Sequence, residues 1–468
     1  MTRAMAQHAA RAPDAARMDW HRLMAPDRYI GDGTVGGPGN LEEVRSPFQK
    51  DADRVIYSAA FRRLQDKTQV HPFPGTDYIR TRLTHSLEVA SVGRSLGTYI
   101  GRHVLGKGPL DYEGGHALTD ADFGAVVGAA CLAHDIGNPP FGHAGEEAIR
   151  HWFRGPGAQY LDGAMDHAAK ADLEHFEGNA QGFRILTRLQ VRREHGGMRL
   201  TVATLGTFGK YPWGVLDSEG HGRRKFGAFQ ADMEALEGVA GHLGLIPAGP
   251  SEWRRHPLAY LTEAADDICY TVVDIEDGVR AGKIAVDVAE SLLTAIGGAP
   301  AAHPGEVTDA QDRVAYLRAR AIGALIDQAK AVFLDSEAEI LAGRFDGRLL
   351  ERIARRAEVA EIERICRAQV FEDPAKLEAE VAGFEVVRGL LDIFAEAAIA
   401  FADAAGDIDR LSPRHQRLIR LLPGWQHLPV DRYELLLRLT DYVSGMTDRF
   451  AVGQFRKLKG LSLGSERA

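Results

Sequence analysis

Apolar residues recur at helical spacing along most of the chain. Over residues 83–104 they fall on roughly one side of a helix, at Leu83, Leu87, Ala90, Leu96 and Ile100. The same spacing covers residues 51–69, 123–134 and 260–278, and residues 312–402 are rich in Ala, Leu, Glu and Arg. This pattern predicts a mainly α-helical fold, with several long helices in the region 312–402.

Three segments interrupt the helical pattern. Residues 198–208 (MRLTVATLGTF) are rich in Thr and Val and precede GKYPWG, which favours a short β-hairpin or a lobed insertion. Residues 31–40 (GDGTVGGPGN) carry glycines whose conformational freedom favours a loop without a regular element. A loop at about 297–310 is expected to separate the central helices from the C-terminal ones.

The length of 468 residues accommodates two or three domains, or one large domain. We expect a peripheral N-terminal segment over residues 1–44, a central unit over 45–290 and a C-terminal helical region over 291–468. The insertion that contains the hairpin is expected over about 188–230. One continuous helical domain with appendages fits the sequence equally well.

Composition narrows the class of protein. The chain is 45% apolar, and its 56 Lys and Arg against 65 Asp and Glu give a formal charge of −9, which excludes a globally basic nucleic-acid-binding coat. Its three cysteines are far apart, which excludes a disulfide framework and a CxxC zinc site. No apolar run approaches the roughly 18–20 residues of a membrane span. We therefore expect a soluble cytoplasmic protein that has no membrane partner.

Two histidines and two aspartates form a candidate metal site: His85 in TRLTHSLEV, His134 and Asp135 in CLAHDIGN, and Asp266 in EAADDICY. An adjacent His-Asp pair at a helix end can present two ligands to one point, and distant helices can supply the others. Nitrogen and oxygen donors of this kind suit Mn²⁺, Mg²⁺, Fe²⁺ or Zn²⁺, and the absence of thiolate argues against a structural zinc site. The alternative is that these residues are helix caps or polar core residues.

The segment after His134-Asp135 contains a candidate acid/base pair. The prolines and glycines of HDIGNPPFGH cannot continue a helix, so the chain must fold back and bring Asn138 and His143 towards the metal pair. Glu146 follows His143 at i+3 and shares one face with it if a helix starts there. A carboxylate hydrogen-bonded to a histidine is typical of a general acid/base. The alternative is an ordinary helix start with a first-turn Glu favoured by the helix dipole.

A stripe of candidate substrate contacts follows Asp266 at helical spacing. Tyr270 and Asp274 lie at i+4 and i+8 and would share one face with the metal ligand. A ring and a carboxylate beside a metal can recognise a sugar, the ring by stacking and the carboxylate by accepting from a hydroxyl. Asp267, Glu276 and Asp277 lie off the stripe, and we expect them to be solvated.

These segments resemble the HD-domain superfamily and, within it, the dGTP triphosphohydrolase family. The similarity lies in seven motifs in the family's order over residues 45–285: FRRLQDKTQV, TRLTHSLEV, AHDIGNPPFGHAGEE, FEGNAQGFRIL, TFGKYP, RRKFG and EAADDICY. A lone HD dipeptide is a weak signal, whereas seven ordered motifs are a specific one. The C-terminal third is similar chiefly through DYVSGMTDRFA.

The resemblance implies an α-helical HD fold that hydrolyses a deoxynucleoside triphosphate, dGTP above all, to deoxynucleoside and inorganic triphosphate. It implies a divalent metal, Mn²⁺ or Mg²⁺ first and Fe²⁺ or Zn²⁺ next. The residues that match the family's metal ligands are His85, His134, Asp135 and Asp266, and those that match its catalytic pair are His143 and Glu146. The residues that match substrate contacts are Gln65, Tyr270 and Asp274 at the sugar, Asn179, Lys210 and Lys225 at the nucleotide and its phosphates, and Arg449 at a phosphate.

Charge supports this transfer, because a substrate with about four negative charges needs cations at its phosphates. The alternative for Lys210 and Lys225 is a solvated loop position. The resemblance also implies a homo-oligomer, with a ring-like hexamer as one expected form, and a response to single-stranded DNA or to an effector dNTP. The run RIARR (352–356) could serve DNA, although at helical spacing a solvated face is the commoner role.

Two other functions compete with this one. A phosphodiesterase or guanosine-tetraphosphate hydrolase of the same superfamily would use the same metal ligands but would not release inorganic triphosphate. A nucleotide sensor or nucleic-acid-binding protein would not need the complete set of metal ligands together with His143 and Glu146. The sequence does not distinguish a dGTP-specific site from one that accepts every dNTP.

Overall fold

Helices make up most of the regular structure in this computed structural model, which describes residues 17–39, 44–69, 80–112, 116–161, 163, 165–190, 196–299 and 309–461. The first ten are α1 (Trp20–Leu23), α2 (Pro47–Ile56), α3 (Ala59–Arg63), α4 (Arg82–Leu105), α5 (Asp120–Ala133), α6 (His143–Arg154), α7 (His167–Glu174), α8 (Gly178–Arg184), α9 (Val202–Phe208) and α10 (Met233–Leu243). They are followed by α11 (Ala259–Arg280), α12 (Val286–Gly297), α13 (Ala310–Leu341), α14 (Arg356–Cys366), α15 (Pro374–Asp403), α16 (Pro413–Leu421), α17 (Arg432–Ser444) and α18 (Asp448–Leu458). The predicted mainly α-helical fold is confirmed.

Short antiparallel strand pairs accompany these helices. They are β1 (Arg28–Gly31) with β2 (Thr34–Gly36), β3 (Asp111–Tyr112) with β4 (His116–Ala117), and β5 (Pro247–Gly249) with β6 (Glu252–Trp253). No sheet among the described residues exceeds two strands, so helices and the segments that join them position the site.

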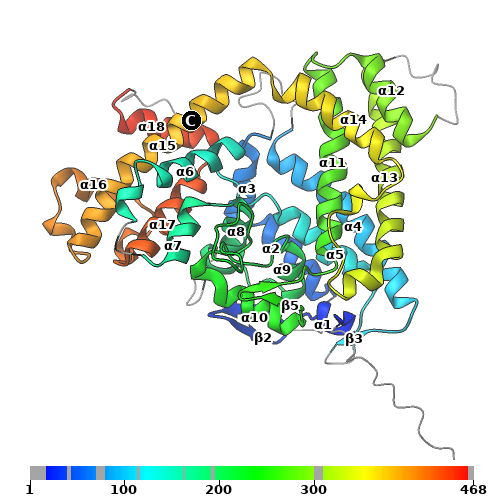
Figure 1. Ribbon diagram of the computed structural model, residues 1–468, viewed down its shortest axis with the longest axis horizontal. Helices are drawn as coiled ribbons and strands as arrows, with labels where there is room; N and C mark the ends of the chain where they lie inside the picture. Colours follow the sequence, from blue (N-terminus) through cyan, green and yellow to red (C-terminus); the bar gives the residue numbers. More distant parts are fainter. Residues whose placement is uncertain are drawn as a thin grey trace, which may run out of the picture.

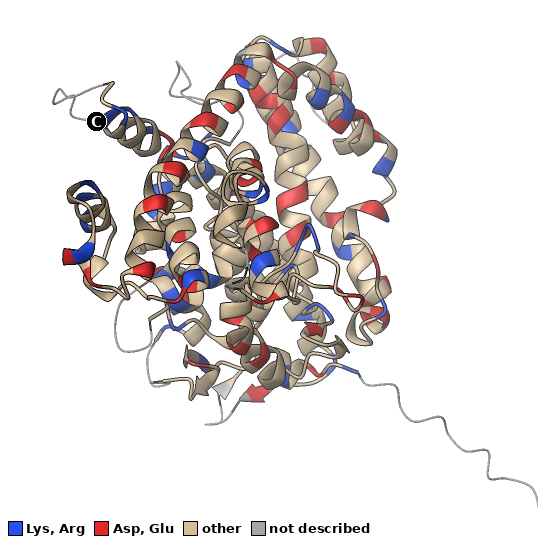
Figure 2. Cartoon of the chain, turned by 60° about the vertical axis from the view of Figure 1, so that its left-hand side comes forward, with Lys and Arg blue, Asp and Glu red and all other residues tan. Residues whose placement is uncertain are grey.

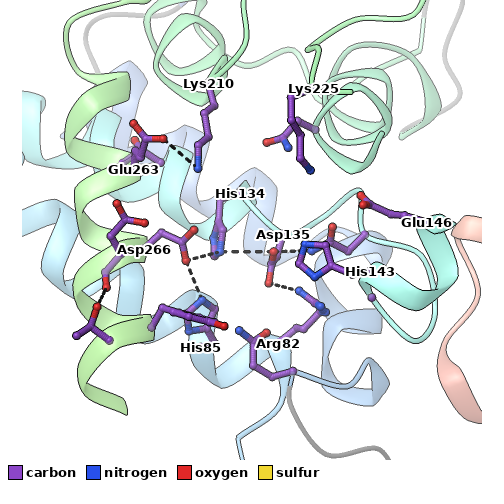
Figure 3. A pocket seen from close by; sticks show the side chains of 18 of the residues that line it. Arg82, His85, His134, Asp135, His143, Glu146, Lys210, Lys225, Glu263 and Asp266 are labelled. Atoms are coloured by element: carbon purple, nitrogen blue, oxygen red, sulfur yellow. Dashed lines mark hydrogen bonds and ion pairs between the residues drawn. The ribbon is translucent and has the colours of Figure 1, made fainter. Parts of the chain in front are cut away.

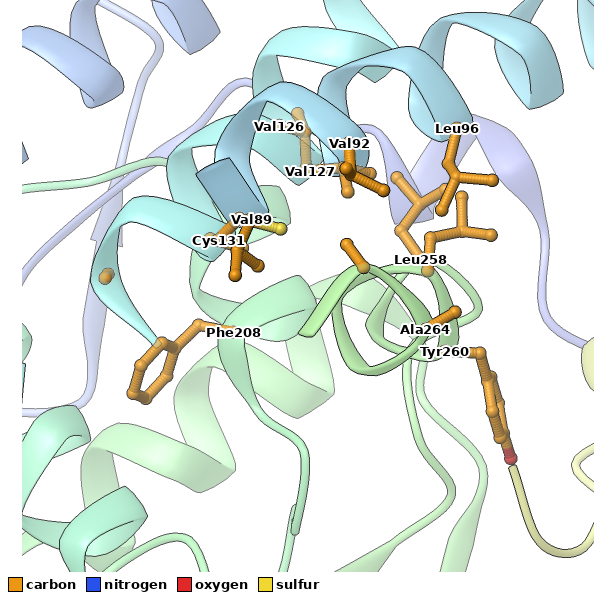
Figure 4. Packing of buried hydrophobic residues seen from close by; sticks show 14 of the residues in the cluster. Val89, Val92, Leu96, Val126, Val127, Cys131, Phe208, Leu258, Tyr260 and Ala264 are labelled. Carbon is orange, nitrogen blue, oxygen red and sulfur yellow. The ribbon is translucent and has the colours of Figure 1, made fainter. Parts of the chain in front are cut away.

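The first hydrophobic core forms where α4, α5 and α11 meet (Figure 4). Val89 and Val92 of α4 pack with Val127 of α5, because apolar residues three and four apart share one helix face. Leu258, at the start of α11, and Phe208, at the end of α9, close the same cluster. This core fixes the relative positions of the three helices that carry His85, His134 and Asp266.

A second hydrophobic core joins α6 and α7 to α15, α17 and the start of α18. Figure 1 shows these helices on one side of the molecule, with α11 to α14 on the other. Residues beyond 290 therefore contribute to both cores, α13 and α14 to the first and α15 to α18 to the second. The proposed boundary near residue 290 stays a prediction.

The prediction of a β-hairpin at residues 198–208 is wrong. Val202–Phe208 forms α9, and Thr201 caps it by accepting a hydrogen bond from the Thr204 N–H at 3.2 Å. All seven residues of the helix are buried. Burial against the core therefore outweighs the β-propensity of Thr and Val, which is a weak preference. The lobed segment that follows, 209–227, contains only isolated bridges such as Leu216 with Gly222.

The expected loop at residues 31–40 is also wrong in its first part, because β1 and β2 form a hairpin there. Asp32 (φ +47°) and Gly33 (φ +67°) make its two-residue turn, and positive φ at both positions is the geometry that Asp-Gly favours. The N-terminal segment 1–44, which was expected to be peripheral, contributes Leu23 and Met24 to the first hydrophobic core. In the loop expected at 297–310, residues 300–308 lie outside the described residues.

Charged residues of both signs are interspersed over the helices (Figure 2). The three cysteines are unpaired and buried. Among the described residues, no helix combines the length and apolar character that a membrane span requires.

Candidate active site

The candidate active site is a cavity of about 600 Å³ between α4, α11, the start of α6 and the segment that follows α9 (Figure 3). Ten of the thirteen residues expected at the site line it: His85, His134, Asp135, His143, Glu146, Asn179, Lys210, Lys225, Asp266 and Tyr270. Gln65, Asp274 and Arg449 do not.

The four candidate metal ligands converge from α4, α11 and the turn that follows α5. The Nε2 atoms of His85 and His134 lie 3.1 Å and 3.5 Å from the same oxygen, Oδ1 of Asp266. Donor atoms of His85, His134 and Asp135 all lie within 4.8 Å of one another. His134 Nδ1 lies 2.7 Å from the carbonyl oxygen of Cys131. Because that contact places the proton on Nδ1, the Nε2 lone pair is free to bind a metal.

Both carboxylates of this group are held in the ionised form. Burial alone would raise the pKa of Asp135, but Arg82 and the two imidazoles outweigh it and lower the pKa to about 2. Burial would also raise the pKa of Asp266. His134, His85 and Lys210 outweigh this effect and hold the pKa of Asp266 well below its usual range. Two anionic carboxylates beside two imidazoles form a donor set that favours a divalent cation.

The turn after His134-Asp135 folds back as the sequence predicts. Asn138 Nδ2 donates to Asp135 Oδ1 at 2.5 Å. At Gly137 the chain passes so close to α8 that a Cβ atom would lie 2.1 Å from the carbonyl oxygen of Gly178 and 2.2 Å from the nitrogen of Gly182. The HDIGN and EGNAQG motifs are therefore packed directly against each other, which brings Asn179 to the cavity.

His143 and Glu146 begin α6 on one turn, as the i+3 spacing predicts. His143 is exposed to the cavity, whereas Glu146 is 3% exposed. Glu146 accepts hydrogen bonds from the Gly178 N–H at 2.8 Å and from Arg150 at 3.0 Å, and not from His143. Burial lowers the pKa of His143, and the Glu146 charge acts in the opposite direction. Glu146 thus acts on His143 through its charge rather than through a hydrogen bond.

Each candidate phosphate-binding lysine is paired with a buried carboxylate. Lys210 Nζ lies 3.2 Å from Glu263, which also binds Arg255 at 3.0 Å. Lys225 Nζ donates to Glu177 at 2.6 Å, and Glu177 also accepts from the backbone N–H of Asn179. Both lysines are part-buried and fixed in place, which contradicts the alternative of solvated loop cations.

The stripe on α11 reaches the cavity only in part. Tyr270 lines it and stacks on Phe371, with ring centroids 5.6 Å apart and an interplanar angle of 12°. Asp274 is 4% exposed, and one of its oxygens has no hydrogen-bond partner. Burial and the neighbouring Asp277 raise the pKa of Asp274 to about 8. Asp274 is thus not among the residues that line the cavity, and its role as a sugar contact stays a prediction.

Two further expected contacts lie elsewhere. Gln65 is exposed on the short helix Leu64–Asp66, and Gln69, four residues later, lines the cavity with a buried and unpartnered Oε1. Arg449 is exposed on α18 and pairs with Asp66 at 3.1 Å. Neither Gln65 nor Arg449 reaches the cavity.

The carboxylates expected to be solvated are not. Asp267 lines the cavity beside Arg348, whose guanidinium lies 3.4 Å away. Glu276 and Asp277 are 2% and 3% exposed, and both pair with Arg80. Arg80 explains why Glu276 and Asp277 are buried, because a cation paired with both carboxylates compensates for their loss of hydration.

Three residues of the site were missed from the sequence. Arg82 and Glu263 line the cavity, and the buried Glu177 lies behind it. Arg82 binds Asp135 at 2.7 Å, and Glu177 and Glu263 hold the two lysines. All three lie inside the motifs TRLTHSLEV, FEGNAQG and EAADDICY, so their position in those motifs was the available signal. The far wall of the cavity is supplied by the region 348–380 and carries the cations Arg348, Arg356, Arg367 and Lys376. Arg356 ends the RIARR run, whose expected role was a solvated face.

Comparison with known proteins gives a consistent result. The HD domain family matches residues 82–181. A deoxyguanosinetriphosphate triphosphohydrolase-like protein of Pseudomonas aeruginosa is 40% identical over 462 residues, covering 95% of this chain and 99% of the relative. A protein of the same description from Synechocystis is 40% identical, covering 95% and 100%. The deoxyguanosinetriphosphate triphosphohydrolase of Yersinia enterocolitica is 31% identical over 502 residues, covering 90% and 96%.

Proposed function

The chain belongs to the deoxyguanosinetriphosphate triphosphohydrolase family of HD-domain phosphohydrolases, and we propose that it hydrolyses dGTP to deoxyguanosine and inorganic triphosphate with a divalent metal. The other dNTPs are further candidate substrates. The observation that carries this proposal is the convergence, in one cavity, of four nitrogen and oxygen donors with the cations Lys210 and Lys225. A triphosphate ester needs both, since its charge must be neutralised before water can attack.

The donor set fits a divalent metal. His85, His134, Asp135 and Asp266 offer two imidazole nitrogens and two ionised carboxylates, and the Cys131 carbonyl orients His134. A metal held there would supply Lewis-acid polarisation of a phosphoryl oxygen. Mn²⁺ and Mg²⁺ are the first candidates, and Fe²⁺ and Zn²⁺ also suit these donors.

Lys210 and Lys225 bind the phosphate chain in this proposal. Each exchanges part of its interaction with a buried carboxylate for one with a phosphate oxygen, so neither has to be ordered when the substrate arrives. Arg82, paired with Asp135, adds a third cation to the lining of the cavity. Asn179 offers an amide at the same wall.

His143 handles the proton at the scissile bond in this proposal, either at the departing 5′ oxygen or at the attacking water. Its exposure to the cavity suits this role, and the lowered pKa of the His143 imidazole favours the neutral ring, which can accept a proton. Glu146, fixed by Arg150 and the Gly178 N–H, supplies a negative charge that favours the imidazolium once it forms.

Product analysis tests this function. The purified protein is incubated with each dNTP and with Mn²⁺ or Mg²⁺, with and without a second dNTP, and the products are separated by ion-exchange chromatography. Deoxynucleoside and inorganic triphosphate in equal amounts support the proposal. Release of pyrophosphate, or turnover of guanosine tetraphosphate or a phosphodiester alone, would instead identify another HD-superfamily hydrolase. Nucleotide binding without turnover would identify a sensor.

The homo-oligomer and the response to single-stranded DNA or an effector dNTP remain predictions. Sedimentation of the purified protein with and without dNTP measures the oligomeric state. Hydrolysis rates with added single-stranded DNA or a second dNTP measure the response to an effector.

A further inference from the structure

The C-terminal motif DYVSGMTDRFA (441–451) spans the end of α17 and the start of α18, and none of its residues lines the candidate active site. Asp448, the first residue of α18, is nevertheless only 2% exposed. Thr447 caps the helix by accepting from the Phe450 N–H at 3.3 Å. Because Thr447 fills that role, the Asp448 carboxylate is left to bind other parts of the chain.

Both oxygens of Asp448 hold segments that line the cavity. Oδ1 accepts from the Phe141 N–H at 2.9 Å. Oδ2 accepts from the Thr68 N–H at 3.0 Å and from the Thr68 hydroxyl at 2.5 Å. Phe141 belongs to the turn after His134-Asp135, and Thr68 follows the short helix Leu64–Asp66. One carboxylate outside the cavity therefore fixes two pieces of its wall that are remote from each other in sequence.

The backbone of Phe141 provides an independent observation. Its φ is +62°, in the left-handed region that glycine adopts freely and a bulky residue rarely does. Such a conformation persists only where the surroundings impose it. Asp448 holds the Phe141 N–H, and the ring lies against Gly383 of α15, where a Cβ atom would come within 2.4 Å of Phe141 Cγ. The strained residue is thus held between α15 and α18.

The position of His143 depends on this strained residue. Gly142, which links Phe141 to His143, is the N-cap of α6 and has no side chain that could fix the start of the helix. Figure 3 shows the His143 imidazole at the cavity, on the first turn of α6. The conformation of Phe141 therefore decides where the imidazole lies.

Lys67 joins the same parts of the molecule a second time. Its side chain is buried, and Nζ donates to the carbonyl oxygen of Asn138 at 2.5 Å and to that of Ser444 at 2.9 Å. Asn138 lies in the turn that carries Phe141, and Ser444 ends α17. The turn and the C-terminal motif are thus linked both through Lys67 and through Asp448.

We infer that Asp448 is a positioning residue for hydrolysis at the candidate active site, an inference that rests on the proposed function. It holds Phe141 in the left-handed conformation and thereby places the His143 imidazole where proton transfer at the scissile bond requires it. A misplacement of about 1 Å can lower a rate by about 10²-fold. Asp448 acts through His143 and does not touch the substrate.

Asp448→Asn is the central test variant, because an amide keeps one acceptor oxygen and replaces the other with a donor. Asp448→Ala removes both acceptors. Asp120→Asn is the matched control, since Asp120 also follows a Thr N-cap at the first position of a helix, α5, and its partner is the exposed Arg102. Thermal unfolding of each variant gives a temperature at which all of them are folded, and every assay is run there.

Release of inorganic triphosphate from dGTP gives the kinetic test. Asp448→Asn should lower kcat by about tenfold or more and change KM by less than about threefold, because misplacement of His143 affects the transition state. Asp448→Ala should lower kcat further, and Asp120→Asn should match the wild type. A large KM effect with unchanged kcat would overturn the inference.

The double variant with His143→Ala distinguishes positioning from a general structural role. If Asp448 acts through His143, adding Asp448→Asn to His143→Ala should lower kcat by no more than about twofold, because the positioned group is already absent. Effects of the two substitutions that multiply in full would overturn the inference.

Amide hydrogen exchange provides a measurement that needs no substrate. Pro139 and Pro140 carry no N–H, so a peptide that begins at Pro139 reports on Phe141 and the residues after it. Exchange at Phe141 should be about tenfold faster or more in Asp448→Asn than in the wild type, and unchanged in Asp120→Asn. Unchanged exchange in Asp448→Asn would overturn the inference. If the wild type releases no triphosphate but exchange responds as expected, the proposed function fails and Asp448 still holds the turn.

Discussion

The ammonium group of Lys225 lies 2.6 Å from Oε1 of Glu177, a carboxylate with no exposed surface. Glu177 also caps α8 by accepting from the Asn179 N–H, so one buried carboxylate holds two of the expected substrate contacts. Both contacts are therefore fixed by the protein's own side chains and backbone.

Replacing Lys225 with Met should raise KM for dGTP by about tenfold, roughly 1.4 kcal/mol of binding, because a ground-state phosphate contact is lost. Lys210→Met should act in the same way. Steady-state kinetics measure both. Lys330→Met is the control, since Lys330 pairs with Asp327 outside the cavity. An unchanged KM in both cavity variants would exclude them as phosphate contacts.

Replacing Asp135 or Asp266 with Ala should abolish metal binding and hydrolysis together, because each removes one of four converging donors. Elemental analysis of the purified protein measures the metal, and Asp327→Asn, at an exposed position, is the control. Stoichiometric metal in an inactive Asp135→Ala protein would show that Asp135 is not a ligand.

Replacing His143 with Ala should lower kcat by roughly 10²–10⁴-fold, the usual contribution of a general acid/base, with metal content and nucleotide affinity retained. Glu146→Gln should also lower kcat, and it should lower stability as well, because the buried Arg150 loses its buried carboxylate partner and keeps only the exposed Glu147. His151→Ala, at an exposed position on the same helix, is the control. A raised KM with unchanged kcat would contradict these roles.

Removing the ring of Tyr270 should weaken the preference for deoxyribose over ribose. A wall of this kind rejects an added hydroxyl by about 10²-fold, unless bulk excludes it completely. Phe371→Ala should have the same effect in weaker form, since Phe371 stacks on Tyr270. The measurement is kcat/KM for dGTP, GTP and 2′,3′-dideoxy-GTP. Equal hydrolysis of GTP and dGTP by the wild type would exclude a sugar wall.

His256 should make the protein less stable in mild acid. Its Nε2–H donates to the Leu23 carbonyl and its Nδ1 accepts from the Leu258 N–H, so the neutral ring is fully satisfied. Complete burial lowers the pKa of His256 to about 4. The unfolded chain binds this proton near pH 6.5, so stability is full above about pH 6.5 and falls as the pH approaches 4.

Because of His256, the free energy of unfolding should fall by about 2 kcal/mol between about pH 7.5 and pH 5. Urea unfolding at both pH values measures it in the wild type and in His256→Gln, which cannot titrate. The variant should show the smaller difference between the two pH values, even if its stability at neutral pH is lower. Identical pH dependence in both proteins would show that His256 is not responsible.

The sequence predicts the helices and the set of metal-site residues because both depend on local patterns. Helical spacing marks α4 and α11, and the HD motif marks the end of α5. The partners of Lys210 and Lys225 are not predictable in this way, because Glu263 and Glu177 are remote in sequence and meet them only in the folded chain.

Errors in the prediction have equally specific causes. Thr and Val in residues 198–208 favour a strand locally, but complete burial stabilises α9 instead. Helical spacing places Asp274 on the face of Tyr270, whereas Asp274 is 4% exposed and does not line the cavity, so its role at the sugar stays a prediction. Gln65 and Gln69 are one helical turn apart, and the chain leaves the helix between them. Neither cavity limits nor helix ends are encoded in a periodic pattern.

The contact at Gly137 couples two motifs that are separate in sequence. Because no side chain fits between Gly137 and the backbone of α8, the His134–Asp135 turn, a candidate metal site, and the start of α8 are held together as one rigid unit. A mutant library that varies either motif alone should yield almost no functional clones at Gly137, Gly178 or Gly182. Any redesign of the nucleotide pocket through Asn179 would have to carry the His134–Asp135 turn with it, so new substrate ranges are more accessible through the far wall, residues 348–380.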